Sequence, residues 1–365
     1  MADQISDSRP PIKFSEAIRE ATTQAMSHDR RVIIIGEGVP DPKGIFGTTI
    51  GLRETFGPDR VFDMPISENA LTGICIGAAL KKLRPILTHQ RVDFSLLSLD
   101  QIINNAAKWH YMFGGQQTVP IVIRMMIGMG WGQGPQHSQS LQALFAQVPG
   151  LKVVMPTTAH DAKGLLLASI QDKNPVIFLE HRWIHGTTGF VPEEMYTVPL
   201  GKAKVIKEGT DITLVAHSYL TIEALHATQI LTEYDINAEV IDLRTISPLD
   251  EETIFNSVKK TGKVVVIDSA SRSGSIAENI VARIATKIYG QLSSAPTIIA
   301  CPDFPAPTSF ALSKNYYPTY KEICERVFHI LKKDGSILQK KLQSEADEKT
   351  TFPHDIPDPS FTGPF

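Results

Sequence analysis

The stretch that decides the fold is VPIVIR (residues 119–124), which runs on into MMIGMGWGQGPQHSQ (residues 125–139). The first segment is apolar up to its terminal arginine, a pattern typical of a strand covered by helices on both faces. A glycine-rich connection then leads to His137, ahead of the next helical segment. This order of strand, loop and helix predicts a parallel sheet, in which ligands bind beyond the carboxyl ends of the strands.

The same alternation of apolar strands and longer helical patterns occurs in both halves of the chain. In the first half we predict strands at 32–35, 85–88, 119–124, 151–155 and 176–179, with helices at 14–27, 69–80, 97–113, 138–147 and 160–171. In the second half we predict strands at 212–216, 238–243, 264–268 and 297–300, with helices at 219–233, 275–289 and 318–333. Alternation of this kind implies right-handed βαβ units.

The segment 185–201 separates the two series, because it holds glycines and prolines without helical periodicity. The predicted fold class is therefore α/β, with two domains built on mostly parallel sheets. We expect the first domain at 1–195, the second at 196–335, and a polar, proline-rich tail at 336–365.

Composition excludes several classes of protein. The chain has 365 residues, of which 42% are hydrophobic, and its formal net charge is -3, so no basic excess points to nucleic acid or to a membrane surface. No apolar run approaches the ~20 residues that span a bilayer, and the first residues lack the apolar core of a secretory signal. Three scattered cysteines predict no disulfide framework. We expect a cytoplasmic protein with no nucleic-acid or membrane partner.

Common catalytic signatures are missing. Neither GxxxxGK[ST] nor GxSxG occurs, so a phosphate loop and a nucleophile elbow are both unsupported. The glycines at 128–134 recur at every second residue, which is not the spacing of a dinucleotide-binding fingerprint. His181 and His185 have the spacing of helical metal ligands, but no third ligand is nearby, so surface or packing roles are favoured.

Two segments carry a chemical signal. In PISENALTGICIGAAL (residues 65–80), Glu68 opens a helix whose Gly73 and Gly77 suggest close approach of another backbone or of a flat ligand. The alternative is an acid that the helix dipole favours at the helix start. His137 can exchange a proton near neutral pH beyond a strand end, or it can simply cap the helix that follows.

Several segments together resemble the β subunit of thiamine-diphosphate-dependent 2-oxo acid dehydrogenases, part of their E1 component. The resemblance covers about residues 12–330 and rests on GEGV at 36–39, on 44–87, on DQIINNAAKWHYMFGGQ at 100–116, on 135–181 and on DLRTISPLD at 242–250. It implies a transketolase-like pyrimidine-binding domain followed by a transketolase C-terminal domain. It also implies thiamine diphosphate as cofactor, an E1 α subunit as partner in a heterotetramer of two α and two β subunits, and a lipoyl-bearing E2.

The resemblance further implies roles for individual residues. Glu68 would hydrogen-bond N1′ of the cofactor's aminopyrimidine and share a proton with it, and Phe94 would stack on the same ring. His137 would orient or protonate the intermediate and assist transfer to the lipoyl group. A structural potassium ion would be held largely by main-chain oxygens, at the positions Ile121, Ser169, Ile170, Asp172 and Asn174.

The chain departs from the family at the substrate side of the pocket. Residues 36–38 read GEG where the family has GED, residues 124–128 read RMMIG in place of RxPxG, and the segment THQRVD at 88–93 is atypical. Cofactor use is therefore expected, whereas the small-molecule 2-oxo acid is left open.

The chain contains no GDG motif with a downstream Asn, the signature that binds Mg2+ and the diphosphate and that belongs to the α subunit in the family. The resemblance implies oxidative decarboxylation of a pyruvate-type or branched-chain 2-oxo acid and acyl transfer to E2. The alternatives are a specialised acyl or acyloin transferase subunit that works without E2, and a non-catalytic structural paralogue.

Overall fold

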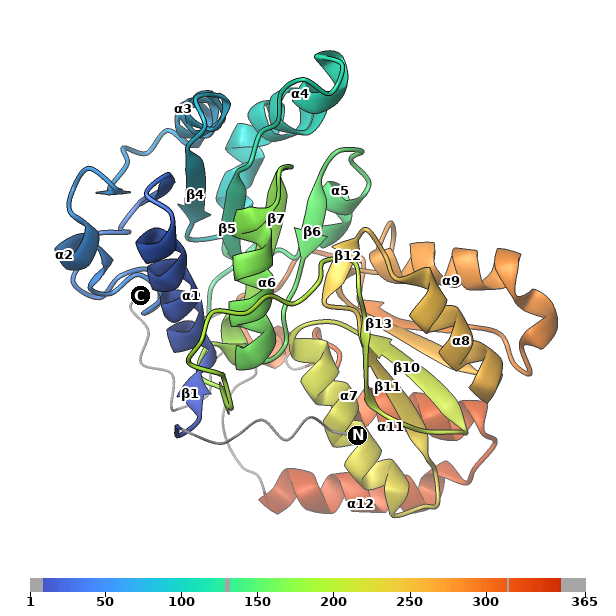
Figure 1. Cartoon of the computed structure of the whole chain (residues 1–365). Helices are drawn as coiled ribbons and strands as arrows, with labels where there is room; N and C mark the ends of the chain where they lie inside the picture. The colour runs from blue at the N-terminus through green and yellow to red at the C-terminus, as the bar shows by residue number, and fades with distance from the viewer. Residues whose placement is uncertain (1–8, 129–131, 314, 349–365) are drawn as a thin grey trace.

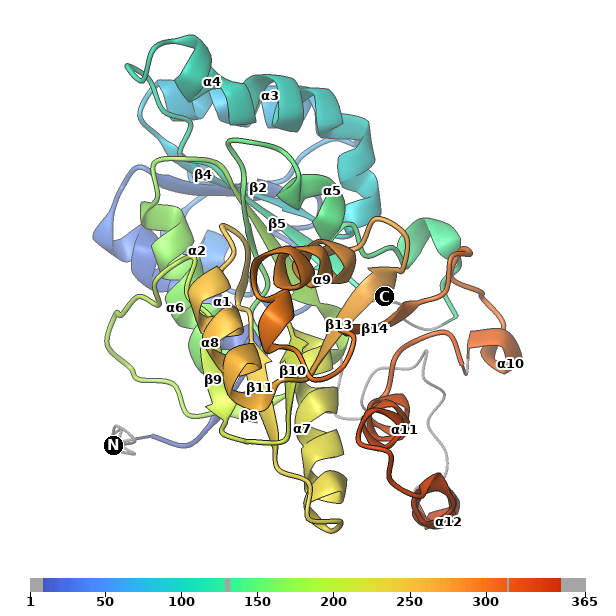
Figure 2. The same cartoon turned by 90° about the vertical axis from the view of Figure 1, so that its right-hand side faces the viewer.

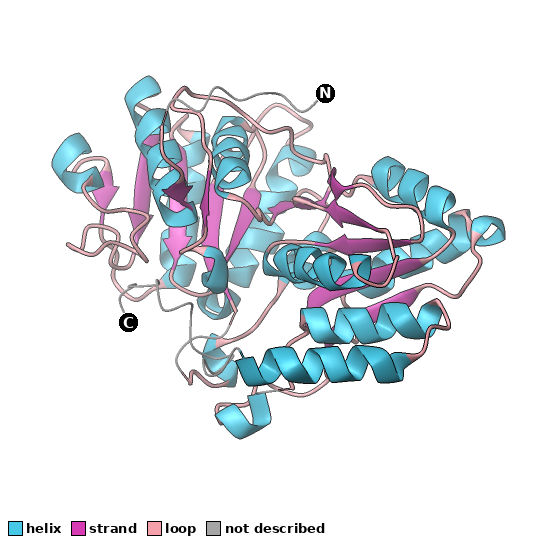
Figure 3. Cartoon of the chain, turned by 90° about the horizontal axis from the view of Figure 1, so that it is seen from below, coloured by secondary structure: helices cyan, strands magenta, loops and turns pink. Residues whose placement is uncertain are grey.

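The computed structural model describes residues 9–128, 132–313 and 315–348. Two α/β units lie side by side, each built around its own sheet (Figure 1). Viewed from below, both sheets carry helices on either side (Figure 3). The predicted class, two α/β domains with mostly parallel sheets, is confirmed.

The first sheet has seven strands in the order β12-β6-β7-β5-β4-β2-β3. All neighbours pair in parallel except at the edge between β12 and β6. The strands are β2 (Val32–Gly36), β3 (Val61–Phe62), β4 (Arg84–His89), β5 (Val122–Ile127), β6 (Lys152–Val154), β7 (Val176–His181) and β12 (Thr245–Ser247).

Helices cover both faces of this sheet, which explains its continuous apolar strands. Side chains of neighbouring strand residues point to opposite faces, so Ile86 packs into one core and Leu87 into the other. Figure 2 shows the helices on the two sides of the sheet. One side carries α1 (Phe14–His28), α2 (Leu52–Phe56) and α6 (Ala159–Gln171), and the other α3 (Glu68–Leu80), α4 (Ala107–Met112) and α5 (Gln142–Ala146).

The second sheet has five strands in the order β14-β13-β10-β11-β9, of which only β9 is antiparallel to its neighbour. The strands are β9 (Lys204–Lys207), β10 (Ile212–Ala216), β11 (Ala238–Asp242), β13 (Val264–Ser271) and β14 (Thr297–Cys301). The helices are α7 (Tyr219–Thr232), α8 (Glu251–Thr261), α9 (Ile276–Lys287), α10 (Phe310–Ser313), α11 (Tyr320–Ile330) and α12 (Gly335–Glu348). β1 (Ile12–Lys13), near the start of the described chain, pairs antiparallel with β8 (Thr188–Gly189), which lies in the segment 185–201 predicted between the domains.

One strand of the second half belongs to the first sheet. β12 pairs with β6, with Thr245 opposite Val154, and the core on the α3 side of the first sheet continues into the second unit through Val215 and Ile280. The two units therefore share apolar contacts, and the division at 195/196 stays a prediction.

The structure differs from the predicted elements in places with identifiable causes. The strand predicted at 119–124 begins at Val122, because Pro120 has no N–H to donate to a ladder. The helix predicted at 97–113 is divided into a 3-10 segment, Val92–Ser98, a π-helical segment, Asp100–Ala106, and α4.

The expected tail at 336–365 is partly wrong. Its first part folds as α12, which buries Leu338 and Leu342 against the core that α7 and α11 share. Residues 349–365 lie outside the described residues, as do 129–131 of the glycine-rich loop.

Two features bear on the classes excluded from the sequence. Within the described residues, no disulfide joins Cys75, Cys301 or Cys324, and all three side chains are buried. Within the described ranges, no helix combines the length and the apolar character needed to cross a bilayer.

A fully buried ion pair joins the middle of the first sheet. Arg124 on β5 donates to both carboxylate oxygens of Glu180 on β7, at 2.7 and 3.0 Å. Burial on its own raises the pKa of the Glu180 carboxyl, but Arg124 and His185 outweigh it and lower that pKa to about 2. Arg124 also donates to the Thr48 hydroxyl at 3.1 Å, which ties the loop after β2 to the sheet.

We expect Arg124→Met and Glu180→Met each to lower the free energy of unfolding by about 3–5 kcal/mol, because each leaves a charged partner uncompensated in the core. The double variant Arg124→Met/Glu180→Met should lose clearly less than the sum of the single losses. Urea unfolding of the three variants and the parent chain gives the coupling free energy. Additive losses would mean that the two side chains act independently.

Candidate active site

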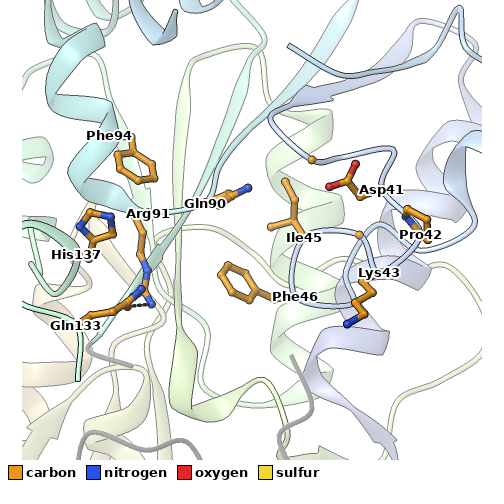
Figure 4. A pocket seen from close by; sticks show the side chains of 12 residues that line it. Asp41, Pro42, Lys43, Ile45, Phe46, Gln90, Arg91, Phe94, Gln133 and His137 are labelled. Atoms are coloured by element: carbon orange, nitrogen blue, oxygen red, sulfur yellow. Dashed lines mark hydrogen bonds between the residues drawn. The ribbon is translucent and has the colours of Figure 1, made fainter. Parts of the chain in front are cut away.

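A pocket of about 620 Å³ opens beyond the carboxyl ends of β2, β4 and β5, three neighbouring strands of the first sheet. This is where ligands bind in parallel α/β sheets. Its walls come from the loops that follow these strands, and Figure 4 shows their side chains. The lining residues are Gly38, Asp41, Pro42, Lys43, Gly44, Ile45, Phe46, Gln90, Arg91, Phe94, Gln133 and His137.

Two of the predicted site residues meet in this pocket. Phe94 comes from the 3-10 segment after β4, and His137 from a 3-10 turn, Pro135–His137, after β5. Their ring centroids lie 5.4 Å apart at an interplanar angle of 89°, an edge-to-face contact. His137 does not cap the next helix, because α5 begins at Gln142 and its N-cap is Leu141. The His137 imidazole is therefore half-buried against an aromatic ring, at the pocket wall.

Glu68 lies beside the pocket rather than in its lining. It is the first residue of α3 and is only 7% exposed. Within the described part of the chain, no group donates a hydrogen bond to its carboxylate. Burial raises the pKa of the neighbouring Glu37 carboxyl, and the charges of Glu68 and Asp63 raise it further. The Glu68 carboxylate is thus close to Glu37, which directly precedes the pocket residue Gly38.

Arg91 is a buried cation in the pocket wall, 3% exposed. It donates to the Gly128 carbonyl at 2.5 Å and to the side-chain oxygen of Gln133. Burial lowers the pKa of its guanidinium to about 10, although Asp93 acts in the opposite direction. These contacts join the loop after β4 to both described ends of the glycine-rich loop after β5.

The predicted potassium positions lie at the opposite edge of the same sheet, near the amino ends of its strands. The main-chain oxygens of Ile170 and Asp172 converge there, but both accept from one nitrogen of Arg84, at 2.7 and 3.0 Å. A guanidinium already fills the place where these oxygens meet. The main-chain oxygen of Ile121 accepts from a strand neighbour, and potassium at this cluster stays a prediction.

The side chains of the other potassium positions bond within the cluster or to their own helix. The Ser169 hydroxyl donates to the carbonyl of Leu165, and Asn174 donates from its main chain and its side chain to the Asp172 carboxylate. Across the described ranges, no group of three His, Cys, Asp or Glu side chains could hold a metal ion.

The two histidines with metal-ligand spacing have packing roles. His181 stacks on Tyr219 with ring centroids 4.9 Å apart and meets Trp183 edge-on at 5.0 Å. His185 lies with its Nε2 3.2 Å from a Glu180 carboxylate oxygen and stacks on Phe14. Both rings are fully or almost fully buried, so the packing interpretation is confirmed.

Sequence reasoning did not include several pocket residues among the candidates. Arg91 and Gln90 directly follow an apolar parallel strand, which is a usable signal, and their segment had been noted only as atypical for the family. Asp41 and Lys43 lie in a loop without periodicity, where the sequence carries no signal for a pocket wall.

Comparison with known proteins gives the family. Residues 10–185 match the family described as transketolase, pyrimidine binding domain, and residues 201–323 match transketolase, C-terminal domain. The β subunit of acetoin:2,6-dichlorophenolindophenol oxidoreductase from Cupriavidus necator is 43% identical, over 84% of this chain and 94% of that protein. The β subunit of the pyruvate dehydrogenase E1 component from Rickettsia bellii is 42% identical, over 87% of this chain and 97% of that protein.

A solved structure supports the fold alone. A split-gene transketolase, described as an inactive beta4 tetramer, matches with a TM-score of 0.74 and 22% sequence identity. The match covers 88% of this chain and 99% of that chain. The expected transketolase-like, two-domain α/β fold is confirmed by these findings together.

Gly128 provides a local test of how the pocket is held. Its φ is +87°, and a Cβ there would lie 2.7 Å from the ring of His181, which Tyr219 and Trp183 fix in place. Gly47 has a similar φ of +78° with nothing within 4 Å of its Cβ position. We expect Gly47→Ala to cost about 1–2 kcal/mol in unfolding free energy, the cost of a left-handed backbone, and Gly128→Ala to cost clearly more.

The measurement is urea unfolding of both variants. Equal losses would show that the Gly128 backbone conformation matters but that its close approach to His181 does not.

Proposed function

This chain belongs to the family of E1 β subunits of 2-oxo acid dehydrogenases, which are oxidoreductase subunits, and we propose that it forms the pyrimidine-binding half of a thiamine diphosphate site. The reaction we propose is oxidative decarboxylation of a 2-oxo acid, with acyl transfer to a lipoyl-bearing E2. The observation that carries the proposal is the pocket at three parallel strand ends in which the Phe94 and His137 rings meet. The cytoplasmic location expected from the sequence stays a prediction.

The residues present fit one half of the cofactor. When bound, thiamine diphosphate supplies the electron sink for decarboxylation. Phe94 offers an aromatic face at the pocket wall. Glu68 offers a buried carboxylate to which no described residue donates, so it is free to accept a hydrogen bond from a ring nitrogen.

The acidic pair beside the pocket suits a proton-sharing role. Two neighbouring carboxyl groups in a buried site favour a state in which one of them keeps its proton. The raised pKa of Glu37 next to Glu68 is consistent with this state. Glu68 would form the hydrogen bond to the ring nitrogen, beside a Glu37 carboxyl whose pKa is raised.

His137 would move a proton on the other side of the same pocket. An imidazole can donate or accept a proton through its ring nitrogens, and the edge-to-face contact with Phe94 orients the His137 ring without consuming either nitrogen. We assign it the positioning of the reacting group and proton delivery during acyl transfer to a lipoyl arm.

The other half of the site would come from an α subunit, because no GDG motif is present to bind Mg2+ and the diphosphate. A surface of α3 and its neighbours supports such a partner. Gly77 of α3 has nothing within 4 Å of its Cβ position. Large apolar side chains are exposed nearby, at Ile66, Ile74, Leu97, Tyr111 and Met112. We propose that subunits of a heterotetramer with two α and two β chains cover this surface.

Co-expression with an E1 α subunit from the same organism tests the proposal. We expect the isolated chain to bind thiamine diphosphate weakly, and the pair to bind it with Mg2+ and to reduce an artificial electron acceptor with a 2-oxo acid. Glu68→Gln in the pair should lower that rate by about 10²–10⁴-fold, the usual range for a lost proton-transfer group. Calorimetry should show that the variant still binds the cofactor.

The outcomes separate the alternatives. A pair that decarboxylates 2-oxo acids but acylates no lipoyl domain would favour a specialised acyl or acyloin transferase. A pair that binds no cofactor and turns over no 2-oxo acid would be a structural paralogue. Tight, Mg2+-dependent cofactor binding by the isolated chain would contradict the shared site.

The subunit surface on α3 has its own test. Gly77→Leu should raise the unfolding free energy of the isolated chain by up to ~1 kcal/mol, because leucine is a better helix former than glycine. The same change should abolish or strongly weaken assembly with the α subunit, since the added side chain projects into the proposed interface. Gly290→Leu is the control, because its Cβ position is also open but lies in the second unit. Gel filtration and calorimetry measure both effects, and unimpaired assembly of the Gly77 variant would remove this surface from the interface.

A further inference from the structure

We propose that Arg91 selects a 2-oxo acid that carries a second carboxylate, remote from the carboxylate lost in the reaction. The inference rests on the function proposed above and names its substrate class. It concerns the wall of the pocket that also contains Phe94 and His137 (Figure 4).

The position of Arg91 is unusual for a charged side chain. It is 3% exposed, yet among the described residues no carboxylate oxygen lies within 4 Å of its guanidinium. Burying a charge without an ionic partner is costly, and proteins normally pair such groups. We infer that the ionic partner of Arg91 is an anionic ligand, which this chain alone does not supply.

The hydrogen bonds of Arg91 within the described chain fix the position of its guanidinium group but do not neutralise its positive charge. Its two described acceptors are the main-chain oxygen of Gly128 and the amide oxygen of Gln133, both of them uncharged. A guanidinium has five N–H donors, and its planar fork matches a carboxylate in two parallel hydrogen bonds. Donors thus remain for a ligand in the pocket.

The charge of Asp93 acts on Arg91, but within the described chain no oxygen of the Asp93 carboxylate lies within 4 Å of the guanidinium. Asp93 accepts from the side chain and the main chain of Gln139, at 2.8 and 3.4 Å. Burial raises the pKa of the Asp93 carboxyl, although the hydrogen bonds from Gln139 and the charge of Arg91 act in the opposite direction. Its other oxygen is buried without a hydrogen-bond partner.

A second buried arginine strengthens the positive field. Burial, and next the charge of Arg91, lower the pKa of the Arg182 guanidinium to about 8. The Arg182 guanidinium carbon lies 4.2 Å from the ring centroid of the pocket residue Phe46. Two cations so close to one pocket raise its affinity for an anion.

Arg91 is suited to a carboxylate that survives the reaction. The charge on the carboxylate that leaves as carbon dioxide disappears on the way to the transition state, so a buried arginine paired with it would stabilise the substrate and slow the step. A second, non-reacting carboxylate keeps its charge throughout. Pairing with Arg91 then lowers KM for such a substrate and leaves the chemical step alone.

The matched substrates are 2-oxoglutarate and 2-oxopentanoate, which have chains of the same length and differ in the second carboxylate. In the assembled enzyme with thiamine diphosphate and an artificial acceptor, we expect kcat/KM to be higher for 2-oxoglutarate. Arg91→Met should reduce the ratio of the two kcat/KM values by about 10²–10³-fold, mainly through KM, which is the effect of truncating a buried charge pair. Arg91→Lys should lower this ratio less than Arg91→Met does, because lysine keeps the positive charge but lacks the planar guanidinium that forms two parallel hydrogen bonds.

Lys43→Met is the control, because it removes a cation from the same pocket at an exposed position. It should change the ratio by less than about 3-fold, as expected for a solvent-screened charge. Calorimetric binding of glutarate, which cannot react, provides a readout independent of turnover. The complex of the unaltered chain should bind glutarate, and the Arg91→Met complex should not.

Failure of this inference differs from failure of the proposed function. Equal losses for both acids, or glutarate binding that does not depend on Arg91, would make Arg91 a structural residue while the decarboxylase function stands. Absence of turnover with every 2-oxo acid would overturn the proposed function, whereas Arg91-dependent glutarate binding would still support the carboxylate site.

Discussion

The buried pair of Arg124 and Glu180 is the interaction on which the candidate site depends. It bridges β5 and β7 in the middle of the first sheet, with both side chains completely buried. Its third contact, from Arg124 to Thr48, fixes the loop that supplies Ile45 and Phe46 to the pocket. Because Arg124 donates to both Glu180 and Thr48 in the buried core, it links the loop of the pocket wall to two strands of the sheet.

The sheet positions the pocket side chains, which lie on the loops after its strands. The strands β2, β4 and β5 end side by side, so short connections bring residues separated by about a hundred positions into one pocket. Gly128 permits the backbone of one loop to pass the ring of His181, and its carbonyl then holds the guanidinium of Arg91. The position of the Arg91 guanidinium in the pocket wall therefore depends on the close approach of Gly128 to His181.

Much of the fold could be predicted from the sequence, because apolar strands with helical connections leave few topologies. The strand β10 agrees with its predicted bounds, 212–216. Features that depend on partners distant in the sequence could not be predicted, such as the crossing of β12 to the first sheet and the burial of Leu338 on α12. Within the site, Phe94 and His137 came from motif resemblance, and their contact is seen in the structure. The position of Arg91 directly after β4 is a sequence signal for a pocket residue, but only the structure shows that its side chain is buried with no described carboxylate oxygen within 4 Å.

At the opposite edge of the first sheet, the buried groups that need a partner are main-chain oxygens, which are partly negative, rather than a positively charged guanidinium. Ile170 lies in the last turn of α6, where main-chain oxygens have no partner within the helix and carry the negative end of the helix dipole. These oxygens need a cation or a donor, and Arg84 at the start of β4 supplies one. At the carboxyl edge, by contrast, the buried Arg91 guanidinium lies in the wall of a pocket, and no described carboxylate oxygen lies within 4 Å of it. At one edge of the sheet the Arg84 guanidinium therefore meets the main-chain oxygens from within the chain. At the other edge we propose that a ligand carboxylate supplies the ionic partner that Arg91 lacks among the described residues.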